Sequence, residues 1–293
     1  MTGPVVVIGS NGQLGVDIVA YLQHQVDVEV IPLSHSDIDI SHLDDLFRIL
    51  KEISPKVVIS TAAWHSPVTD ENVGRFFQTN ATGSYNLAVV CREITADLVW
   101  FSTDYVFDGQ TKQPYTEQSV ANPISVYGVS KYSGEMIIRN IWHKHFVIRI
   151  AGVYGIQGCR AKGGTNVVET FIKLAQGNTS TTFNADQYAS STYTVDVAER
   201  LPTLIDSQRY GLYHMVNTGE FSWYEFAQKI FSVLGIKPEI IPGKMDDQKS
   251  EYPRPRYSVL ENAELKRAGI VDMPTVQDAL GRYIEARNTR KTI

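Results

Sequence analysis

Three residues in the middle of the chain have the types and spacing that chemistry on a carbonyl or an alcohol requires. Thr103 ends an apolar run that leads into a turn, and Tyr127 and Lys131 stand four residues apart in a segment predicted to be helical. Residues four apart share one face of a helix, so the Lys131 ammonium is expected to stabilise the phenolate of Tyr127. The pKa of the phenol, ordinarily about 10, would then fall and make Tyr127 a usable acid. Thr103 would place a second hydroxyl beside the same substrate oxygen.

A tyrosine and a lysine with this spacing also arise by chance in a chain with 15 tyrosines, so the N-terminus is needed as a second indication. It has an apolar run at 4–8, a glycine turn at 9–15 and an amphipathic helical segment after it. Gly9 permits a tight turn, Gly12 lets the backbone approach a pyrophosphate, and Gly15 lets the helix pack closely on the strand. The phosphate would meet the positive end of that helix. The pattern predicts a dinucleotide cofactor.

The composition argues against several classes of protein. With 293 residues and 43% hydrophobic content, the chain can form a full core, as one large domain with a smaller lobe or as two domains. A net charge of −5 without a basic cluster argues against nucleic acid as a partner. Cys91 and Cys159 lack metal-ligand spacing, and Cys91 is expected to be a buried thiol. We expect a cytoplasmic protein, because the first strand begins too close to Met1 for a signal peptide and no apolar run reaches membrane-spanning length.

Apolar strands alternate with helices through the first half of the chain. The predicted strands are 4–8, 28–33, 56–61, 97–102 and 145–150, and the predicted helices are 16–22, 43–53, 74–94, 124–142 and, further on, 167–175. Pro123 is expected at the start of the helix 124–142, where its missing amide proton costs nothing. The alternation predicts an α/β fold with a doubly wound parallel sheet of the Rossmann type. Ligands gather at the carboxyl ends of such strands, where Gly9, Thr61, Thr103 and Ile150 stand.

The regular alternation of apolar strands and helices ends at about Gly152. A glycine-rich and basic stretch at 155–164 is followed by shorter elements with tyrosines and polar turns. We expect residues 1–152, with parts of the C-terminal half, to form the dinucleotide-binding domain. Residues 153–293 are expected to form mainly a smaller substrate-binding lobe that closes over the cofactor.

These patterns resemble the dTDP-4-dehydrorhamnose reductase family of the extended short-chain dehydrogenase/reductases, over nearly the whole chain. The most specific match is Ser-Thr-Asp-Tyr-Val-Phe-Asp-Gly at 102–109. Further matches are Asn122-Pro123, Val126-Tyr127-Gly128, Ser130-Lys131, Gly134-Glu135, Val153-Tyr154-Gly155, Asp186-Gln187, Tyr213-His214, Ser222 to Ala227, Arg254-Pro255 and Ser258-Val259-Leu260.

The resemblance implies an NAD(P)H-dependent oxidoreductase that reduces the C4 ketone of a nucleotide-linked 4-keto-6-deoxy sugar, most directly dTDP-4-dehydrorhamnose to dTDP-rhamnose. It implies that Thr103, Tyr127 and Lys131 are catalytic, and that Lys131 also binds the nicotinamide ribose. The predicted cofactor residues are Gly9, Asn11, Gly12, Gln13, Leu14, Ser34, His35, Asp39, Ile40, Thr61, Ala62, Ala63, Tyr127 and Lys131. The predicted substrate residues are Trp64, Asp104, Tyr105, Val106, Asn166 and Arg254.

Several of these residues have an equally good structural explanation. Asp39 either approaches the adenine or takes part in a turn, because 41–44 has the form of a capping box for the next helix. Trp64 and His65 either touch the sugar or pack in a loop. Arg254 either binds the substrate diphosphate or forms a surface ion pair. Asn80 either kinks the long helix and holds a water of a proton relay, or is an ordinary surface residue.

The chain departs from the family near the sugar. Where the family has a Val-Asp pair before a glutamate, residues 64–71 read Trp-His-Ser-Pro-Val-Thr-Asp-Glu, and only Glu71 fits. Gly152 stands in place of a tryptophan, and Ala189 and Ser191 replace a glycine and a proline. We therefore expect reductase chemistry with an altered sugar pocket, in which a tryptophan at 152 changes the relative rates among 4-keto sugars.

Two other functions stay open. One is a non-catalytic nucleotide-binding subunit similar to the regulatory subunit of methionine adenosyltransferase, against which the intact Thr103, Tyr127 and Lys131 argue. The other is a nucleotide-sugar epimerase or dehydratase, with Asp104 where a glutamate is expected beside the threonine. The sequence does not decide whether the protein forms a homodimer. It also does not decide whether the protein binds the Mg²⁺ ion that some family members use at a dimer contact. Asp17 is the acidic match for that ion, and we assign no metal ligand.

The choice between NADH and NADPH depends on the residues after the second strand. An acidic residue there favours NAD, whereas this chain has Ser34-His35-Ser36. Either a partly protonated His35 attracts a 2′-phosphate modestly, or His35 only sits in a turn and faces solvent. The sequence predicts that both cofactors are used, with NADPH preferred by a small factor that grows as pH falls, unless Asp37 folds back toward the phosphate.

Overall fold

The computed structural model describes residues 3–65, 69, 71–159, 163–177, 180–245 and 253–291. Part of the loop that departs from the family, residues 66–68 and 70, lies outside the described residues. So do residues 160–162 of the glycine-rich stretch.

A six-stranded parallel sheet has the strand order β10-β5-β4-β3-β1-β2. Its strands are β1 (Gly3–Ile8), β2 (Val28–Leu33), β3 (Val57–Ser60), β4 (Asp97–Thr103), β5 (His145–Ile150) and β10 (Gly211–His214). All neighbouring strands in this order run parallel. The chain passes from β1 to β2 on one side and then to β3 on the other side of β1. An open α/β sheet forms a ligand crevice where its strand order reverses in this way.

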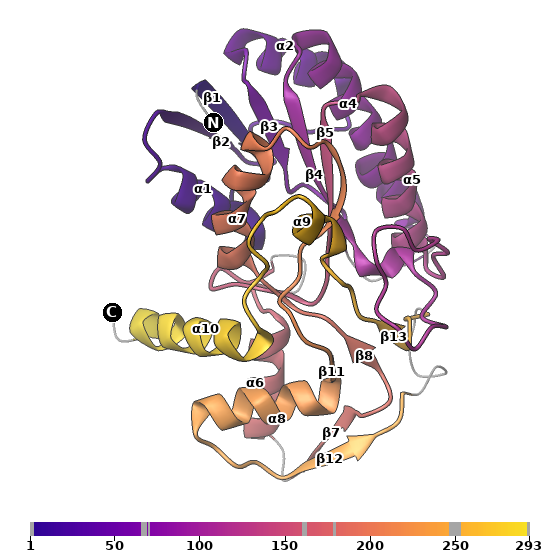
Figure 1. Cartoon of the computed structure of the whole chain (residues 1–293), viewed down its shortest axis with the longest axis vertical. Helices are drawn as coiled ribbons and strands as arrows, with labels where there is room; N and C mark the ends of the chain where they lie inside the picture. The colour runs from indigo at the N-terminus through magenta and orange to yellow at the C-terminus, as the bar shows by residue number, and fades with distance from the viewer. Residues whose placement is uncertain are drawn as a thin grey trace.

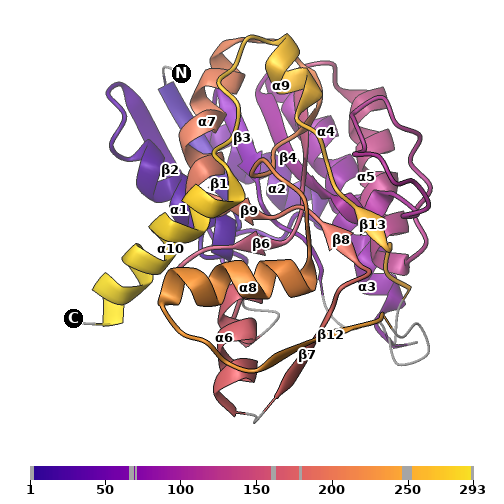
Figure 2. The same cartoon turned by 60° about the horizontal axis from the view of Figure 1, so that its bottom comes forward.

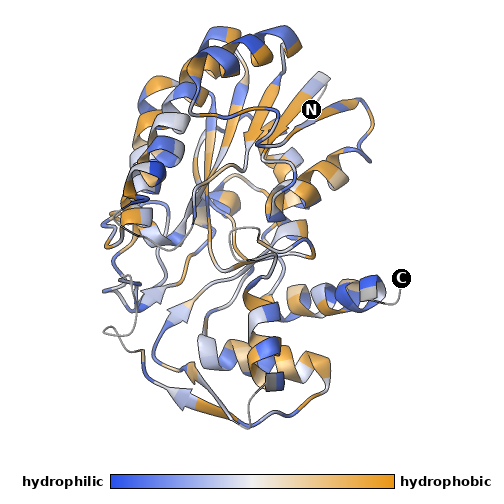
Figure 3. Cartoon of the chain, turned by 180° about the vertical axis from the view of Figure 1, so that it is seen from behind, coloured by the Kyte–Doolittle hydropathy of each residue, from blue (hydrophilic) through white to orange (hydrophobic). Residues whose placement is uncertain are grey.

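Helices cover both faces of the sheet, which confirms the doubly wound α/β fold (Figure 1). One face is covered by α1 (Gln13–Leu22) and α7 (Thr194–Asp206), and the other by α2 (Leu43–Ile53), α4 (Gly83–Ile94) and α5 (Val126–Ile141). In β1, Val5 and Val7 face the first layer and Val6 and Ile8 the second, because successive strand side chains point to opposite faces. The strands are therefore hydrophobic between amphipathic helices, as Figure 3 shows.

Most predicted elements are confirmed, and those at 28–33, 43–53 and 145–150 begin and end as predicted. The predicted helix 74–94 is interrupted. It consists of α3 (Val73–Phe77), a π-helical turn at Gln78–Thr82, and α4. Asn80 lies in the π-helical turn and is buried. The regular helix is thus interrupted at Asn80, while the kink itself stays a prediction, and π-turns of this kind often mark functional sites.

The second half of the chain adds a smaller region below the sheet in Figure 1 and in front of it in Figure 2. Its helices are α6 (Val167–Gly177), α8 (Trp223–Leu234) and α10 (Val276–Lys291). Its short strands are β6 (Val153–Tyr154), β7 (Thr181–Asn184), β8 (Tyr188–Ala189), β9 (Thr192–Tyr193), β11 (Phe221–Ser222), β12 (Ile240–Gly243) and β13 (Tyr257–Ser258). Aromatic side chains, among them Tyr154, Phe183 and Phe226, form its core. From this half of the chain, β10 belongs to the main sheet, and α7 and α9 (Ala263–Arg267) pack against that sheet. The boundary between two domains at 152/153 stays a prediction.

Two expectations from composition can be checked against the structure. Cys91 on α4 is buried, as predicted, and this burial raises the pKa of its thiol. Within the described ranges, no helix has both the length and the apolar character needed to cross a membrane.

Candidate active site

Thr103 is the last residue of β4, and its hydroxyl closes the turn that follows. The hydroxyl donates to Asp104 Oδ1 at 3.1 Å and accepts from the Tyr105 amide at 3.2 Å. A threonine suits this position between a strand and a turn. Its branched side chain fits the strand, and its hydroxyl can form a hydrogen bond with an amide of the turn. The hydroxyl is thereby fixed at the carboxyl edge of the sheet, in a residue that is 6% exposed.

Tyr127 lies in the first turn of α5, which begins at Val126 rather than at Ile124. The predicted start at Pro123 is wrong because Ser125 caps the helix, accepting a hydrogen bond from the Gly128 amide at 3.1 Å. A side-chain cap satisfies an amide that would otherwise lack a partner, and so it fixes the helix start. A Cβ on Gly128 would lie 2.1 Å from the Tyr105 carbonyl oxygen. This close approach brings the start of α5, and with it Tyr127, against the turn after Thr103.

The expectation that the pKa of Tyr127 falls is wrong. Burial raises the pKa of Tyr127 above its ordinary value, the charge of Asp104 raises it further, and a hydrogen bond with Thr103 opposes them. Tyr127 is therefore a neutral phenol at neutral pH, which is the form that donates a proton. Because an alkoxide is a stronger base than a phenolate, this phenol can still protonate the oxygen of a ketone undergoing reduction.

Lys131 is buried on α5, against the Trp100 ring of β4. It is 1% exposed, and its Nζ lies 3.7 Å from the centroid of the Trp100 ring. Burial lowers the pKa of Lys131 to about 7, although the carboxylate of Glu135, one helical turn further on, opposes this. The amine is thus poised between its charged and neutral forms near neutral pH.

Glu135, whose charge acts on Lys131, belongs to a buried ionic network. The connections of this network were not predicted from the sequence. Both carboxylate oxygens of Glu135 accept from the Arg149 guanidinium, at 2.9 and 2.6 Å. Arg149 Nη1 also lies 3.5 Å from His214 Nε2. Burial and the charge of Arg149 lower the pKa of His214 to about 3, so this imidazole is neutral. Glu135 and His214 were noted in the sequence only as matches to the family. Their local sequence does not indicate that both contact the Arg149 guanidinium.

Asn80 holds the loop that follows β3 against the candidate site. Its side chain accepts from the Trp64 amide at 2.9 Å and donates to the Trp64 carbonyl at 3.1 Å and to Ser130 Oγ at 3.0 Å. The next residue, His65, packs edge-on against the Tyr127 ring, with centroids 4.9 Å apart. The structure therefore places His65 beside Tyr127 and holds Trp64 on Asn80, while the contact of either residue with a sugar stays a prediction.

The glycine turn after β1 fits the pyrophosphate of a dinucleotide. Gly9 has a φ of +79°, and a Cβ there would lie 2.6 Å from Thr61 Oγ1, while one on Gly15 would lie 2.2 Å from the Gly9 carbonyl oxygen. Thr61 donates to that carbonyl, joining the ends of β1 and β3 at the crevice. The N-cap of α1 is Gly12, which offers no side chain to the first-turn amides, and Gln13 Nε2 is buried without a partner among the described residues. These donors suit an anion at the helix N-terminus.

The other predicted cofactor residues surround this turn. Leu14 and Ile40 are buried, Asn11, Ser34, Asp39, Thr61 and Ala62 are partly exposed, and His35 and Ala63 are exposed. Asp39 Oδ1 accepts from the Ser41 amide at 2.9 Å and from its hydroxyl at 2.8 Å. This turn confirms the structural explanation of Asp39, whereas the capping box is wrong, because His42 is the N-cap of α2 and makes no side-chain cap. Contact of these residues with a cofactor stays a prediction.

Asp37 does fold back toward the end of β2. Asp37 Oδ2 accepts from the Ser34 amide at 2.7 Å and from the Ser34 hydroxyl at 2.6 Å. The condition that would remove the expected preference for NADPH is therefore met.

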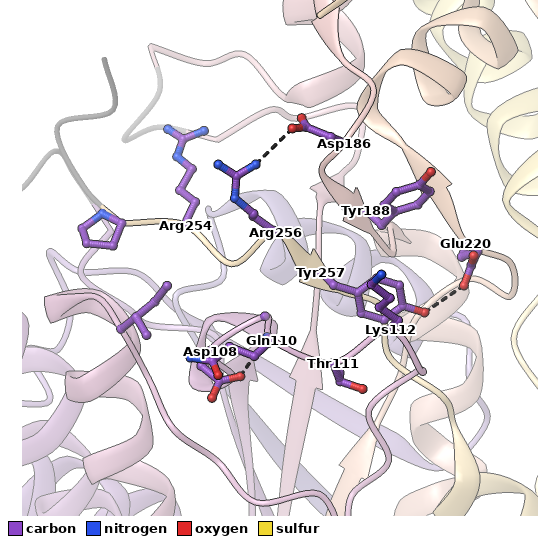
Figure 4. A pocket seen from close by; sticks show the side chains of 13 residues that line it. Asp108, Gln110, Thr111, Lys112, Asp186, Tyr188, Glu220, Arg254, Arg256 and Tyr257 are labelled. Atoms are coloured by element: carbon purple, nitrogen blue, oxygen red, sulfur yellow. Dashed lines mark hydrogen bonds and ion pairs between the residues drawn. The ribbon is translucent and has the colours of Figure 1, made fainter. Parts of the chain in front are cut away.

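A pocket of about 1110 Å³ opens beside the candidate site, lined in part by Asp108, Tyr188, Arg254, Arg256 and Tyr257 (Figure 4). In it, Arg256 pairs with Asp186 at 3.0 Å, and the Tyr257 hydroxyl donates to Glu220 at 2.9 Å. Arg256 was missed, although its spacing of two from Arg254 in an extended segment could have indicated a shared face.

Arg254 connects this pocket to the candidate catalytic residues. Burial raises the pKa of Tyr105 to about 12, Asp104 adds to this, and the charge of Arg254 opposes it. The Tyr105 ring centroid lies 6.0 Å from that of Tyr127. The pocket is therefore one side chain away from the proposed acid.

Two predicted substrate residues have structural partners in this structure. Val106 is buried in a hydrophobic cluster with Phe107 and Tyr115. Asn166 donates to the Gly155 carbonyl and to the Tyr283 hydroxyl, both at 2.9 Å, and accepts from the Glu169 amide at the start of α6. Their contact with substrate stays a prediction, and our functional proposal does not depend on it.

No metal ligand set is found among the described residues, where no group of three or more His, Cys, Asp or Glu side chains is placed to hold an ion. Asp17, the acidic match for a magnesium ion, accepts a hydrogen bond from Thr194 between α1 and α7. Burial raises the pKa of Asp17, and this hydrogen bond opposes the shift.

The departures from the family at 152, 189 and 191 lie in packed structure. Gly152 has a φ of +49°, and a Cβ there would lie 2.7 Å from the Ser190 carbonyl oxygen and 3.3 Å from Ser191 Cα. Ala189 and Ser191 are 4% and 0% exposed. A tryptophan at 152 would thus strain the backbone, and its effect would not report on the sugar alone.

We expect Gly152→Ala to lower the melting temperature by about 2 to 6 °C, because strain of this kind costs about 1 to 3 kcal/mol. Rates on all 4-keto sugars should change together. Gly281→Ala is the matched control, because a Cβ there meets nothing within 4 Å. Thermal unfolding of both variants checks the prediction, and a Gly152→Ala protein with unchanged melting temperature but altered sugar preference would contradict it.

Known proteins resemble this chain over its whole length. The model of the family described as the RmlD substrate binding domain matches residues 2–289. The spore coat polysaccharide biosynthesis protein SpsK of Bacillus subtilis (strain 168) is 35% identical over 286 residues, which are 97% of this chain and 98% of that protein.

Two solved structures extend the similarity to the fold. A dTDP-4-dehydrorhamnose reductase from Clostridium acetobutylicum ATCC 824 has a TM-score of 0.91 at 34% identity, over 97% of this chain and 99% of that one. The dTDP-4-dehydrorhamnose reductase of Bacillus anthracis str. Ames, solved in complex with NADP, has a TM-score of 0.89 at 32% identity, over 98% of this chain and 100% of that one. With the fold, the placement of the candidate residues and these matches in agreement, the chain belongs to the RmlD substrate binding domain family.

Proposed function

We propose that this protein reduces the C4 ketone of a nucleotide-linked 4-keto-6-deoxy sugar, and that it converts dTDP-4-dehydrorhamnose to dTDP-rhamnose. It is an NAD(P)-dependent oxidoreductase. The observation that carries the proposal is the close approach of the first turn of α5, which bears Tyr127, to the turn after Thr103 at the carboxyl edge of the sheet, beside a glycine turn that fits a dinucleotide. The two solved structures described above support the choice of substrate, because both bear the name of this reductase.

The proposed roles follow from the positions of the side chains. When bound, the nicotinamide cofactor supplies the hydride. Tyr127 donates its proton to the oxygen as negative charge develops there, and Thr103 turns its hydroxyl from Asp104 to the same oxygen. Lys131 holds the nicotinamide ribose and places positive charge near the phenolate that Tyr127 becomes. The carboxylate of Glu135, which Arg149 holds through two hydrogen bonds, favours the charged form of Lys131.

The nucleotide end of the substrate is assigned to the pocket that contains Arg254 and Arg256 (Figure 4). A guanidinium binds a diphosphate through paired hydrogen bonds. Asp186 already engages Arg256, so Arg254 is the better candidate for the diphosphate.

We expect Arg254→Ala to raise the KM for the nucleotide sugar about 10- to 100-fold, the loss typical of a hydrogen bond to a charged group. Its Kd for the cofactor should stay unchanged. Arg48→Ala, which removes an exposed guanidinium paired with Asp45 on α2, is the control. Steady-state kinetics test this, and an unchanged KM would assign Arg254 to the surface.

Cofactor stoichiometry separates the proposed reductase from the alternatives. The purified protein is given NADPH or NADH with dTDP-, GDP- and UDP-linked 4-keto sugars, and cofactor and sugar are both quantified. A reductase consumes one cofactor per sugar, an epimerase changes the sugar without net consumption, and a non-catalytic subunit does neither. Asp104, buried beside Thr103, keeps the epimerase as the second candidate. The proposal includes a cytoplasmic location and a homodimer, and light scattering of the purified protein tests the latter.

A further inference from the structure

We infer that Asp37 determines the cofactor preference of this protein, because its carboxylate occupies the donors at the end of β2 that a 2′-phosphate would need, and that the protein therefore favours NADH over NADPH. The inference rests on the proposed function only in assuming that a dinucleotide binds at the glycine turn. It reverses the preference expected from the sequence.

The turn that holds Asp37 adjoins the glycine turn directly. The carbonyl of Leu33, the last residue of β2, accepts from the amides of Gly9 and Ser10 at 2.8 and 3.1 Å. Ser34 follows at once, and the Ser34 amide and hydroxyl both donate to Asp37 Oδ2. The Ser34 and Ser36 hydroxyls also share a hydrogen bond of 2.7 Å. The two hydroxyls that were expected to receive a 2′-phosphate are thus joined to each other and to a carboxylate.

The imidazole expected to attract the phosphate is also next to a carboxylate. Burial acts to raise the pKa of Asp39, but hydrogen bonds from Ser41 and the charges of His35 and His42 lower it overall. The Asp39 carboxylate therefore lies close enough to the His35 imidazole for the two to interact. The segment 34–41 contains no lysine or arginine. A 2′-phosphate would approach two carboxylates with only histidines to offset them.

Asp37 itself remains charged at neutral pH. The hydrogen bonds from the Ser34 hydroxyl and amide lower its pKa, and the weaker effect of desolvation opposes them. An ionised carboxylate has about four acceptor sites, so Asp37 can keep Ser34 and still accept from a ribose hydroxyl. The neutral 2′-hydroxyl of NADH would find an acceptor there. The 2′-phosphate of NADPH would meet like charge and no free donor from Ser34.

The test measures binding without any sugar. Calorimetric titration with NAD⁺, NADP⁺, 5′-AMP and adenosine 2′,5′-bisphosphate compares each ligand with its 2′-phosphorylated counterpart. The wild type should bind NAD⁺ more tightly than NADP⁺, and 5′-AMP more tightly than the bisphosphate. Asp37→Ala releases the Ser34 donors and removes one charge, so the affinity ratio should move toward the 2′-phosphorylated ligand by about tenfold or more in both pairs.

Two further variants distinguish charge near the site from this contact. Asp44→Asn removes one charge from the first turn of α2, and it should leave the ratio unchanged. Asp37→Asn keeps the shape and removes only the charge, and it should shift the ratio in the same direction as Asp37→Ala. A wild type that prefers NADP⁺, or a ratio that Asp37→Ala does not move, overturns the inference. If neither dinucleotide binds the folded protein, the proposed function fails with it, whereas dinucleotide binding without sugar turnover would leave the inference standing alone.

Discussion

Replacing Tyr127 by phenylalanine is expected to lower kcat about 10²- to 10⁴-fold, the usual effect of removing a general acid. The Kd of the cofactor should stay nearly unchanged. The ring contacts with His65 and Phe76, at centroid distances of 4.9 and 6.4 Å, involve only the aromatic ring, which phenylalanine keeps. Single-turnover kinetics with the 4-keto sugar measure the chemical step directly.

Tyr132→Phe is the matched control for this variant, because it removes a phenol from the same helix away from Thr103. Tyr132 packs against the hydrophobic cluster that contains Phe107, and its variant should turn over like the wild type. Near-normal turnover by the Tyr127→Phe protein would remove Tyr127 from the mechanism.

Replacing Lys131 by methionine is expected to stabilise the cofactor-free protein while lowering kcat at least about 100-fold. A buried lysine whose pKa falls from 10.5 to about 7 costs up to about 5 kcal/mol in free energy of folding when it is charged. The Trp100 face offsets about 2 kcal/mol of this cost. Methionine fills similar space without charge, and Glu135 keeps both its hydrogen bonds to Arg149. We expect a net gain of about 2 kcal/mol, or several degrees in melting temperature.

The pH dependence of this gain has a definite sign. Below pH 7 the folded wild type must carry a charged, buried Lys131, so the cost is present in full. Between about pH 7 and pH 10.5 the unfolded chain binds the proton that the folded chain has lost, so wild-type stability rises with pH. The advantage of Lys131→Met should therefore be largest near pH 6 and shrink toward pH 10.

Lys51→Met is the control for the lysine variant. Lys51 also lies over an aromatic ring, that of Phe47 at 5.3 Å, but it is exposed on α2. It should change neither the melting temperature at pH 6 nor kcat. A Lys131→Met protein less stable than the wild type at pH 6 would show that the Trp100 contact outweighs the cost of burial.

The positions of the candidate catalytic residues could be predicted because each depends on local sequence. The apolar run before Thr103 predicts a buried strand that ends there, and the turn residues after it predict where the chain leaves the sheet. The spacing of Tyr127 and Lys131 predicts a shared helix face. The glycine pattern after β1 indicates the turn because its residues serve the backbone itself, as the φ of Gly9 shows.

Features that depend on contacts between distant segments could not be predicted. The pKa of Tyr127 depends on its burial and on the charge of Asp104 in the turn after β4, which the spacing of Tyr127 and Lys131 does not reveal. Arg149 and His214 are 65 residues apart, and only the parallel pairing of β5 and β10 brings them together. Whether Asp37 folds back onto Ser34 is decided by the turn geometry after β2, and sequence left both outcomes open.

Transfer of hydrogen from the cofactor to C4 of the sugar is the central claim, and isotope transfer tests it most directly. NADH and NADPH carrying deuterium at C4 of the nicotinamide, on one face or the other, are incubated with dTDP-4-dehydrorhamnose and the purified protein. The account predicts dTDP-rhamnose with one deuterium at C4 from one of the two labelled faces, and one cofactor oxidised for each sugar formed. A sugar product without deuterium from either face, or no oxidation of either cofactor, would contradict it.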